Sequence, residues 1–164
     1  AMATAASETF TSTSAPIQYA AVAAFQKDPE IESYLIESRR VLGALGTWCV
    51  QRLRDAGAHC DDPEGGFYFF PDFSALKDKL AARGIETSAQ LCTRLLDEAG
   101  VAVLPGSDFG RPKKELTLRA AYVDFDGGAA IQASANLDGD LDEAFLRTYC
   151  SNVTDAIDAW TAWL

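Results

Sequence analysis

One arginine in this sequence stands in a pattern suited to binding a carboxylate. Residues 116–122 alternate apolar and other side chains, as a strand with one buried face does. The alternation places Thr117, Arg119 and Ala121 on one face, where small neighbours leave the guanidinium room. A guanidinium held on a strand can bind a carboxylate through two parallel hydrogen bonds. A solvent-facing arginine or a structural ion pair fits the same pattern, so these alternatives stay open.

A row of acidic residues is a second candidate site. Asp138, Asp140 and Asp142 have the spacing that opens a calcium loop. The positions that require Gly and Glu further along hold Glu143 and Tyr149 instead. These acids therefore fit better as helix-capping and first-turn residues, which the helix dipole favours.

Histidine and cysteine offer no recognisable site. His59 is the single histidine and has no partner at a diagnostic spacing. The four cysteines are scattered and include no C-x-x-C pair. The sequence contains neither a phosphate-binding G-x-x-x-x-G-K-S/T loop nor a G-x-S-x-G elbow. It therefore predicts no catalytic residue and no metal site in this chain.

The composition excludes several classes of function. The chain has 164 residues, 48% of them hydrophobic, and a formal net charge of −10. These values predict a folded globular protein and argue against nucleic acid or an anionic membrane surface as a partner. No stretch reaches the ~18 to 20 apolar residues of a membrane-spanning helix, and the N-terminus lacks the features of a signal peptide. We therefore expect a cytoplasmic protein with reduced cysteines.

Periodicity and capping signals predict the elements that position Arg119. Thr87 and Gln90 have the spacing of a capping box, and Asp140 with Glu143 marks the start of a last helix. Helices are predicted over residues 17–25, 31–56, 74–84, 88–99 and 140–164. Strands are predicted over residues 65–70, 101–104 and 116–122, with residues 124–140 irregular. The sum is an α+β fold in which helices pack on a small three- to four-stranded sheet.

Four motifs follow one another in an order that resembles a known family. They are TSTSAPIQYAA at residues 11–21, EGGFYFFPDF at 64–73, LLDEAGVAVLPGSDFG at 95–110 and LTLR at 116–119. Together they resemble the C-terminal part of class I/II aminotransferases, which are fold-type I enzymes dependent on pyridoxal phosphate. The similarity covers about residues 9–164, and the segment 127–139 departs from the commonest family pattern.

The resemblance implies roles for two residues and for the parent enzyme. Arg119 matches the family arginine that binds the substrate α-carboxylate. Phe109 is implied to lie near the substrate, in a loop over residues 105–110 at the mouth of the active site. The resemblance also implies that the substrates are an amino acid and a 2-oxo acid, as in an enzyme of amino-acid metabolism. It implies that the full-length enzyme is a homodimer.

The family lysine that binds the cofactor has no counterpart in this sequence. The five lysines, none of which matches the lysine motif, are Lys27, Lys77, Lys79, Lys113 and Lys114. We therefore expect a fragment: residues 1–8 a tag remnant and flexible N-terminus, 9–28 the last helix of the large domain with its connection, and 29–164 the small C-terminal domain. Such a chain should neither hold pyridoxal phosphate tightly nor transaminate alone. The alternative is an autonomous α+β module that binds a small molecule or a protein without catalysis.

Overall fold

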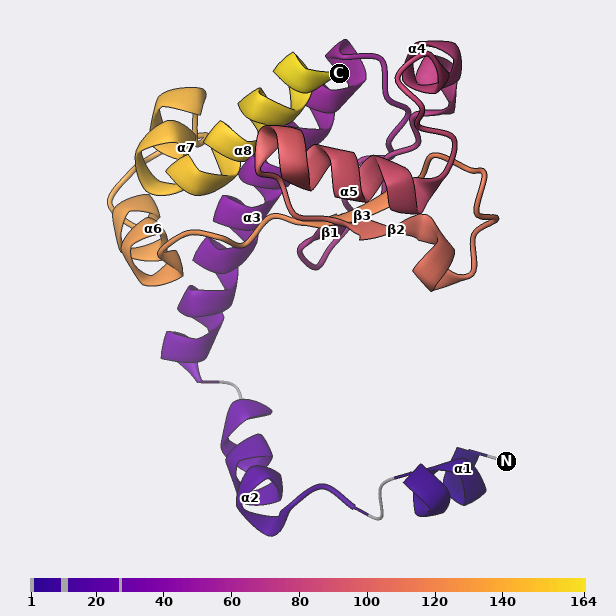
Figure 1. Cartoon of the computed structure of the whole chain (residues 1–164). Helices are drawn as coiled ribbons and strands as arrows, with labels where there is room; N and C mark the ends of the chain where they lie inside the picture. Colours follow the sequence, from indigo (N-terminus) through magenta and orange to yellow (C-terminus); the bar gives the residue numbers. More distant parts are fainter. Residues whose placement is uncertain (1, 10–11, 27) are drawn as a thin grey trace. The chain divides into compact units, whose positions relative to one another are not determined.

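The structure is a computed structural model that describes residues 2–9, 12–26 and 28–164. The chain divides into two units, residues 1–36 and residues 37–164. Figure 1 shows that the sheet and most of the helices belong to the second unit.

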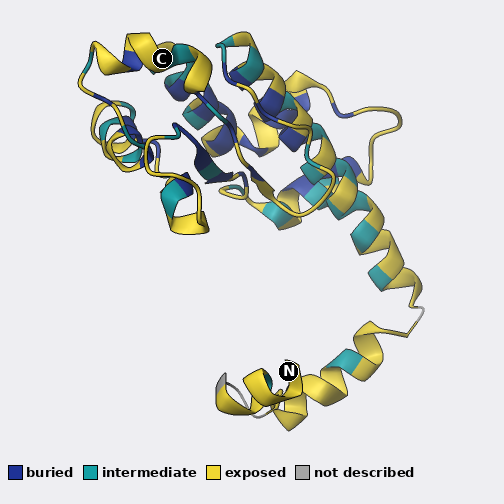
Figure 2. Cartoon of the chain, turned by 90° about the vertical axis from the view of Figure 1, so that its right-hand side faces the viewer, coloured by how far each residue is buried: buried dark blue, intermediate teal, exposed yellow. Residues whose placement is uncertain are grey.

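The first unit is helical. It contains α1 (Met2–Thr9) and α2 (Ala15–Ala24), and α3 (Pro29–Asp55) begins there. Pro16 occupies the first turn of α2, where its missing N–H costs no hydrogen bond, so the helix predicted over residues 17–25 is confirmed. No residue of α2 is buried, as the exposed and half-buried colours of Figure 2 show. Thr11, in the first motif, and Lys27 lie outside the described residues.

Helix α3 buries one face in the core of the second unit. Val41, Leu45 and Cys49 recur every four residues on this face and are almost fully inaccessible. Val50 and Leu53 are buried as well, whereas Leu42, the neighbour of Val41, is only half-buried. The helix ends as predicted just before Gly57, whose φ of 98° lies in the left-handed region that glycine adopts without strain.

Three short antiparallel strands form the sheet. They are β1 (Tyr68–Phe69), β2 (Leu104–Pro105) and β3 (Leu118–Ala121), in the order β1-β3-β2. The predicted α+β class with a small sheet is confirmed, whereas β1 and β3 are shorter than predicted and β2 overlaps the strand predicted over residues 101–104 only at Leu104. Pro71 lies two residues after β1, and Pro105 ends β2. Neither proline has an N–H group to donate, so the hydrogen bonding between strands is weaker at these positions.

Helices cover the buried face of the sheet (Figure 1). Helix α5 (Ser88–Ala99) begins at the predicted cap, where Thr87 Oγ1 accepts a hydrogen bond from Gln90 N at 3.3 Å. Helix α8 (Ser151–Trp163) contributes Trp160, which is fully buried with its ring 5.6 Å from that of Phe73. The short elements η1 (Ser74–Leu76) and α4 (Lys77–Ala81) precede α5.

The prediction of an irregular segment over residues 124–140 is wrong. Helix α6 (Gly127–Ser134) lies within it. The carboxylate of Asp126 caps this helix by accepting a hydrogen bond from Ala129 N at 3.0 Å. Each of the two glycines that begin α6 disfavours a helix by about 1 kcal/mol relative to alanine. The Asp126 cap and the alanines that follow the glycines offset this cost, and the helix forms.

The single last helix predicted from Asp140 is also wrong. Two helices replace it, α7 (Glu143–Tyr149) and α8, and they meet at Cys150, which has φ −126° and ψ 34°. The first of them begins after Asp142, whose carboxylate accepts a hydrogen bond from Phe145 N at 2.9 Å. The break lets the two helices bury different apolar faces, which one straight helix could not do.

Arg40 of α3 stabilises the end of α6 and the segment that follows it through hydrogen bonds to backbone carbonyl groups. Its guanidinium donates to Ser134 O at 2.7 Å, to Leu137 O at 2.8 Å and to Gly139 O. Replacing Arg40 by Ala should lower the free energy of unfolding by about 2 kcal/mol, because charge-assisted hydrogen bonds to three carbonyl groups are lost. Urea unfolding measures this, and Arg39→Ala, at an exposed neighbour, should change it by less than about 0.5 kcal/mol. Equal effects of the two substitutions would contradict the role of Arg40.

Glu98 joins the end of α5 to the end of α8 and leads to a prediction about pH. Its carboxylate accepts hydrogen bonds from Arg94 Nε, from Trp163 Nε1 at 2.8 Å and from Arg83 at 2.9 Å. These bonds, led by the one from Arg94, lower the pKa of Glu98 from 4.5 to about 2. A carboxyl whose pKa is lower in the folded state stabilises the fold above its unfolded pKa and loses that effect as pH falls.

The stability of the chain should therefore fall as the pH is lowered from 4.5 to about 2, and part of that fall should be due to Glu98. Glu98→Gln should make the fall shallower in urea unfolding measured across this range. Glu86→Gln removes a carboxyl that makes none of these bonds and should leave the fall unchanged. Identical pH profiles for the wild-type chain and Glu98→Gln would overturn the assignment.

Two features are absent from residues 2–9, 12–26 and 28–164, the part of the chain that the structure describes. Among those residues no helix has both the length and the hydropathy needed to cross a membrane. Within the same ranges, no three His, Cys, Asp or Glu side chains come together as metal ligands do. Asp142 acts as a helix cap instead.

Candidate functional site: an arginine between two aromatic rings

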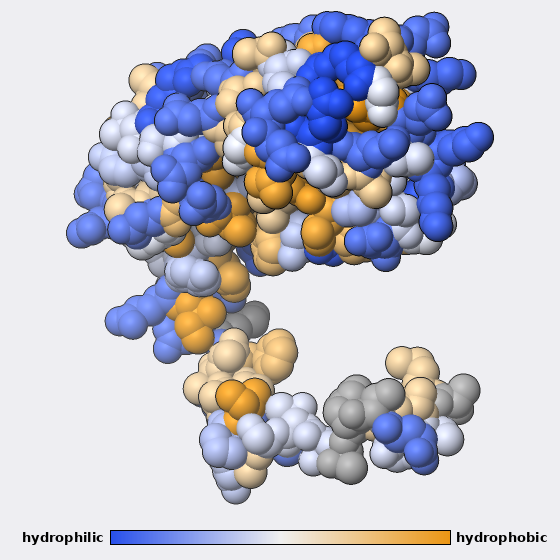
Figure 3. All heavy atoms as spheres, viewed as in Figure 1, coloured by the Kyte–Doolittle hydropathy of each residue, from blue (hydrophilic) through white to orange (hydrophobic). Residues whose placement is uncertain are grey.

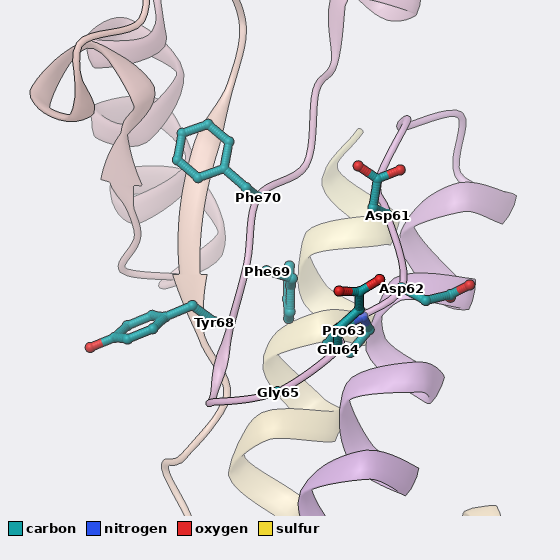
Figure 4. Close-up of a pocket in the computed structure, with 8 residues that line it drawn as sticks. All are labelled: Asp61, Asp62, Pro63, Glu64, Gly65, Tyr68, Phe69 and Phe70. Atoms are coloured by element: carbon teal, nitrogen blue, oxygen red, sulfur yellow. The ribbon is translucent and has the colours of Figure 1, made fainter.

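The register of the sheet decides which side chains share a face with Arg119. Leu104 lies opposite Arg119, and Tyr68 lies opposite Ala121, so these four side chains project from the same face. Tyr68 is 43% exposed, whereas Phe69, on the other face, is 5% exposed. Figure 4 shows Tyr68 and Phe70 on one side of the chain and Phe69 pointing the opposite way, toward the helices. The Arg119 face is therefore the one that the helices of this unit leave uncovered.

Arg119 is half-buried between two aromatic rings. Its guanidinium carbon lies 4.1 Å from the ring centre of Phe109 and 4.5 Å from that of Tyr68. Such cation–π contacts hold the guanidinium in place without using its N–H groups. Within the described ranges, no carboxylate or other acceptor bonds to the Arg119 guanidinium. Other arginines do form ion pairs with carboxylates, namely Arg40, Arg52, Arg54, Arg83, Arg94, Arg111 and Arg147.

The turn that carries Phe109 is held against β3. Phe109 ends η2 (Gly106–Phe109), and Gly106 N donates to Thr117 O at 2.8 Å. A Cβ atom on Gly106 would lie 2.0 Å from Thr117 Oγ1, so only glycine allows this approach. The turn closes at Gly110, which has φ 81°. Phe109 is therefore fixed over Arg119 by packing between two segments that are close in space.

The structure excludes one of the alternatives that the sequence left open for Arg119 and adds two residues near it. A structural ion pair is excluded for Arg119 within the described residues. Phe109, expected near the substrate, lies against Arg119 as described. Tyr68 and Phe70 were not predicted as site residues from the sequence. In the structure Phe70 packs edge-on against Phe109, with ring centres 6.1 Å apart. The aromatic run 67–70 was the available signal, but its register to β3 is set by the tertiary fold.

A shallow concavity of about 670 Å³ lies beside β1. Figure 4 shows three carboxylates in it, from Asp61, Asp62 and Glu64. Asp62 pairs with Arg54 at 2.9 Å, which compensates part of the charge. Figure 3 shows hydrophobic side chains scattered among hydrophilic ones on the surface of residues 37–164. Tyr68 and Phe70 also line this concavity, so it is an acidic surface feature that borders the Arg119 site.

The described residues provide binding groups rather than reactive ones. Burial raises the pKa of the Cys49 thiol to about 12, and burial raises the pKa of the Cys92 and Cys150 thiols to about 11. These thiols therefore stay protonated and are poor nucleophiles. His59 is exposed, and its backbone bonds to that of Asp72. Arg119 and its two rings can bind and orient an anion with a planar, two-oxygen end.

Comparison with known proteins identifies the family. Residues 1–124, three quarters of the chain, match the family described as Aminotransferase class I and II. A probable aspartate/prephenate aminotransferase of Aquifex aeolicus is 38% identical over 96 residues, 58% of this chain and 23% of that protein. An asparagine–oxo-acid transaminase of Streptococcus mutans is 33% identical over 126 residues, 75% of this chain and 29% of that protein.

The fold agrees with the sequence similarity. The crystal structure of an aromatic aminotransferase from Pyrococcus horikoshii OT3 matches with a TM-score of 0.61 and 26% identity, covering 90% of this chain and 31% of that one. The aspartate aminotransferase of Rhizobium meliloti, 23% identical, has the same fold with a TM-score of 0.54, covering 98% and 34%. The chain spans about a quarter of the length of the curated relatives it matches. It belongs to the class I and II aminotransferase family.

Proposed function

We propose that this chain provides the substrate-carboxylate site of an amino-acid aminotransferase, with Arg119 as the residue that binds the α-carboxylate. The observation that carries the proposal is the guanidinium of Arg119, which is held between Tyr68 and Phe109 and has no acceptor among the residues that the structure describes. Relatives are named for aspartate, prephenate, asparagine and oxo acids, all of which carry a carboxylate. An amino acid and its 2-oxo acid share this group, so one arginine serves both substrates.

The two rings make Arg119 a better anion site than a mobile surface arginine. They restrict the side chain before the ligand arrives, so less conformational entropy is lost on binding. They also exclude water from both sides of the guanidinium, which strengthens its interaction with a carboxylate. Phe109 is proposed to contact the bound substrate next to its carboxylate.

Pyridoxal phosphate is the cofactor that the family implies, and the described residues do not fit a site for it. A lysine that binds the cofactor needs an enclosed pocket. Lys77 and Lys79 are exposed on α4, and Lys113 and Lys114 are exposed before β3. We therefore assign to this chain only the binding and orientation of the carboxylate. The proposal is that the chain alone neither holds the cofactor tightly nor transaminates.

The proposal extends to the protein in which this chain acts. In this proposal the full-length protein is a homodimeric enzyme of the cytoplasm, and residues 29–164 form its small domain. The cysteines are free thiols, which is compatible with a reducing compartment. The alternative of an autonomous module without catalysis is not favoured, because family membership extends over three quarters of the chain.

A titration of the chain tests carboxylate binding directly. Adding 2-oxoglutarate should shift the NMR signal of the Arg119 Nε–H group with a dissociation constant in the millimolar range, as expected for one charge-assisted contact on a partly exposed site. The Arg39 signal should not move, and the diester of 2-oxoglutarate should have no effect. Pyridoxal phosphate added to the same sample should give no stoichiometric absorbance band of a lysine-bound cofactor. Shifts that are equal at Arg39 and Arg119 would refute a specific site.

A further inference from the structure

Strand β1 carries one of the two rings that enclose Arg119, yet the chain that leads into this strand has few contacts of its own. The strand consists of Tyr68 and Phe69 alone. The segment before it, residues 63–66, is largely exposed and ends in two glycines, which have more backbone freedom than other residues. The position of the Tyr68 ring, 4.5 Å from the Arg119 guanidinium carbon, therefore depends on what fixes the start of β1.

Tyr122, the residue after β3, holds the start of β1 through three contacts. Its hydroxyl donates a hydrogen bond to Gly66 O at 3.3 Å, and its N–H group donates to Phe67 O at 3.2 Å. Its ring stacks on that of Phe69, with ring centres 5.6 Å apart and an angle of 18° between the planes. Within the ranges that the structure describes, residues 63–66 make no hydrogen bond other than the one from the Tyr122 hydroxyl.

The sheet register places Tyr122 behind the carboxylate site. Tyr122 follows Ala121, which lies opposite Tyr68, so the side chain of Tyr122 points to the other face of the sheet. On β1 that face is occupied by Phe69, and Tyr122 itself is only 2% exposed. Tyr122 therefore acts on β1 from the buried face, whereas Arg119 and Tyr68 project from the uncovered one.

Helix α3 leaves room for the Tyr122 hydroxyl at Gly46. A Cβ atom on Gly46 would lie 2.9 Å from the hydroxyl oxygen and 2.8 Å from Pro63 Cγ. A side chain at this position would therefore displace the hydroxyl or the segment that contains Pro63. Burial raises the pKa of Tyr122, so the hydroxyl keeps its proton and remains a hydrogen-bond donor at neutral pH.

We propose that Tyr122 is a positioning residue for the carboxylate site, an inference that rests on the function proposed for Arg119. Its hydroxyl fixes the start of β1 and so keeps the Tyr68 ring against the guanidinium. Tyr122 itself contacts no substrate, because it lies on the opposite face of the sheet. Loss of the hydroxyl should leave Arg119 less restricted on the side of Tyr68, so more conformational entropy is lost when a carboxylate binds.

Tyr122→Phe tests the proposal, because it removes the hydroxyl and keeps the ring. In the NMR spectrum without ligand, the Arg119 Nε–H signal should lose part of the ring-current shift that Tyr68 gives it, and cross-relaxation between the two side chains should weaken. The dissociation constant of 2-oxoglutarate should rise about three- to tenfold, as expected if most of the effect of one hydrogen bond reaches the site. An unchanged Arg119 signal in the folded variant would overturn the proposal, whatever the affinity.

Thr154→Val is the matched control. Thr154 is fully buried on α8, and its hydroxyl donates to Ser151 O at 3.0 Å. Both substitutions remove a buried hydroxyl that is bonded to a carbonyl group, so both should lower the free energy of unfolding in urea by a similar amount. Thr154→Val should leave the Arg119 signal unchanged and the dissociation constant within about twofold. Equal changes in the two variants would reduce the role of Tyr122 to general stability and would refute positioning.

Gly46→Ala affects the same hydrogen bond without changing Tyr122, so the proposal stays falsifiable if Tyr122→Phe does not fold. It should move the Arg119 signal in the same direction as Tyr122→Phe. Gly43→Ala, on the same helix with nothing within 4 Å of the new methyl group, should not move it. A folded Gly46→Ala chain with the wild-type Arg119 signal would contradict the proposal. If the wild-type chain did not bind 2-oxoglutarate at Arg119, the proposed function would fail, and the signals without ligand would still decide the role of Tyr122.

Discussion

Replacing Arg119 by Ala should lower kcat/KM for aminotransfer by about 30- to 900-fold. The range corresponds to ~2 to 4 kcal/mol for the loss of a charge-assisted contact to the substrate carboxylate. The assay needs a protein that contains both this chain and a cofactor-binding lysine, because the described residues form no cofactor site. Rates of transfer from several amino acids to 2-oxoglutarate measure the effect.

Two further variants separate charge from geometry. Arg119→Lys keeps the charge but loses the planar fork, so its kcat/KM should fall between those of the wild-type protein and Arg119→Ala. Arg39→Ala removes the same charge from an exposed site and should leave kcat/KM within about twofold. If Arg119→Ala kept the wild-type kcat/KM, the carboxylate role of Arg119 would be wrong.

Replacing Gly106 by Ala should lower the free energy of unfolding by about 3 kcal/mol. The new methyl group would lie 2.0 Å from Thr117 Oγ1 and 2.9 Å from Thr117 O, so the backbone of the turn or of β3 must move. That movement should also displace Phe109 from Arg119, because Phe109 lies on the turn that begins at Gly106 and Arg119 lies on the strand next to Thr117. Urea unfolding measures the stability, and the 2-oxoglutarate titration should show weaker binding at Arg119.

Gly43 is the matched control for this substitution. It lies in the interior of α3, and a Cβ atom there would meet nothing within 4 Å. Gly43→Ala should therefore raise the free energy of unfolding by about 0.5 to 1 kcal/mol, because alanine loses less backbone entropy in a helix. Opposite signs at the two positions are the expected result. A Gly106→Ala chain as stable as the wild type would mean that the close approach to Thr117 is not required.

Local signals in the sequence were sufficient for several elements and insufficient for others. Thr87 and Gly57 mark helix ends as predicted, since a cap or a left-handed glycine acts within a few residues. Helix α6 was missed because Gly127 and Gly128 have the composition of a turn, and the cap from Asp126 outweighed it. The break at Cys150 has no strong local signal and follows from how α7 and α8 pack.

The extents of the strands were also beyond the sequence. The aliphatic run 101–104 has the composition of a buried strand, yet only Leu104 pairs with β3, and it is exposed. Ladder formation requires a partner at the right register, and that partner lies more than ten residues away in the chain.

The sequence by itself determined the α+β class, the family and the choice of Arg119, because these depend on periodicity and on the order of motifs along the chain. Only the tertiary structure decided that Arg119 has no carboxylate partner among the described residues and that Tyr68 and Phe109 enclose it. The physical reason is that both contacts join segments distant in sequence. Strand register places Tyr68, and the space left by the missing side chain of Gly106 places Phe109.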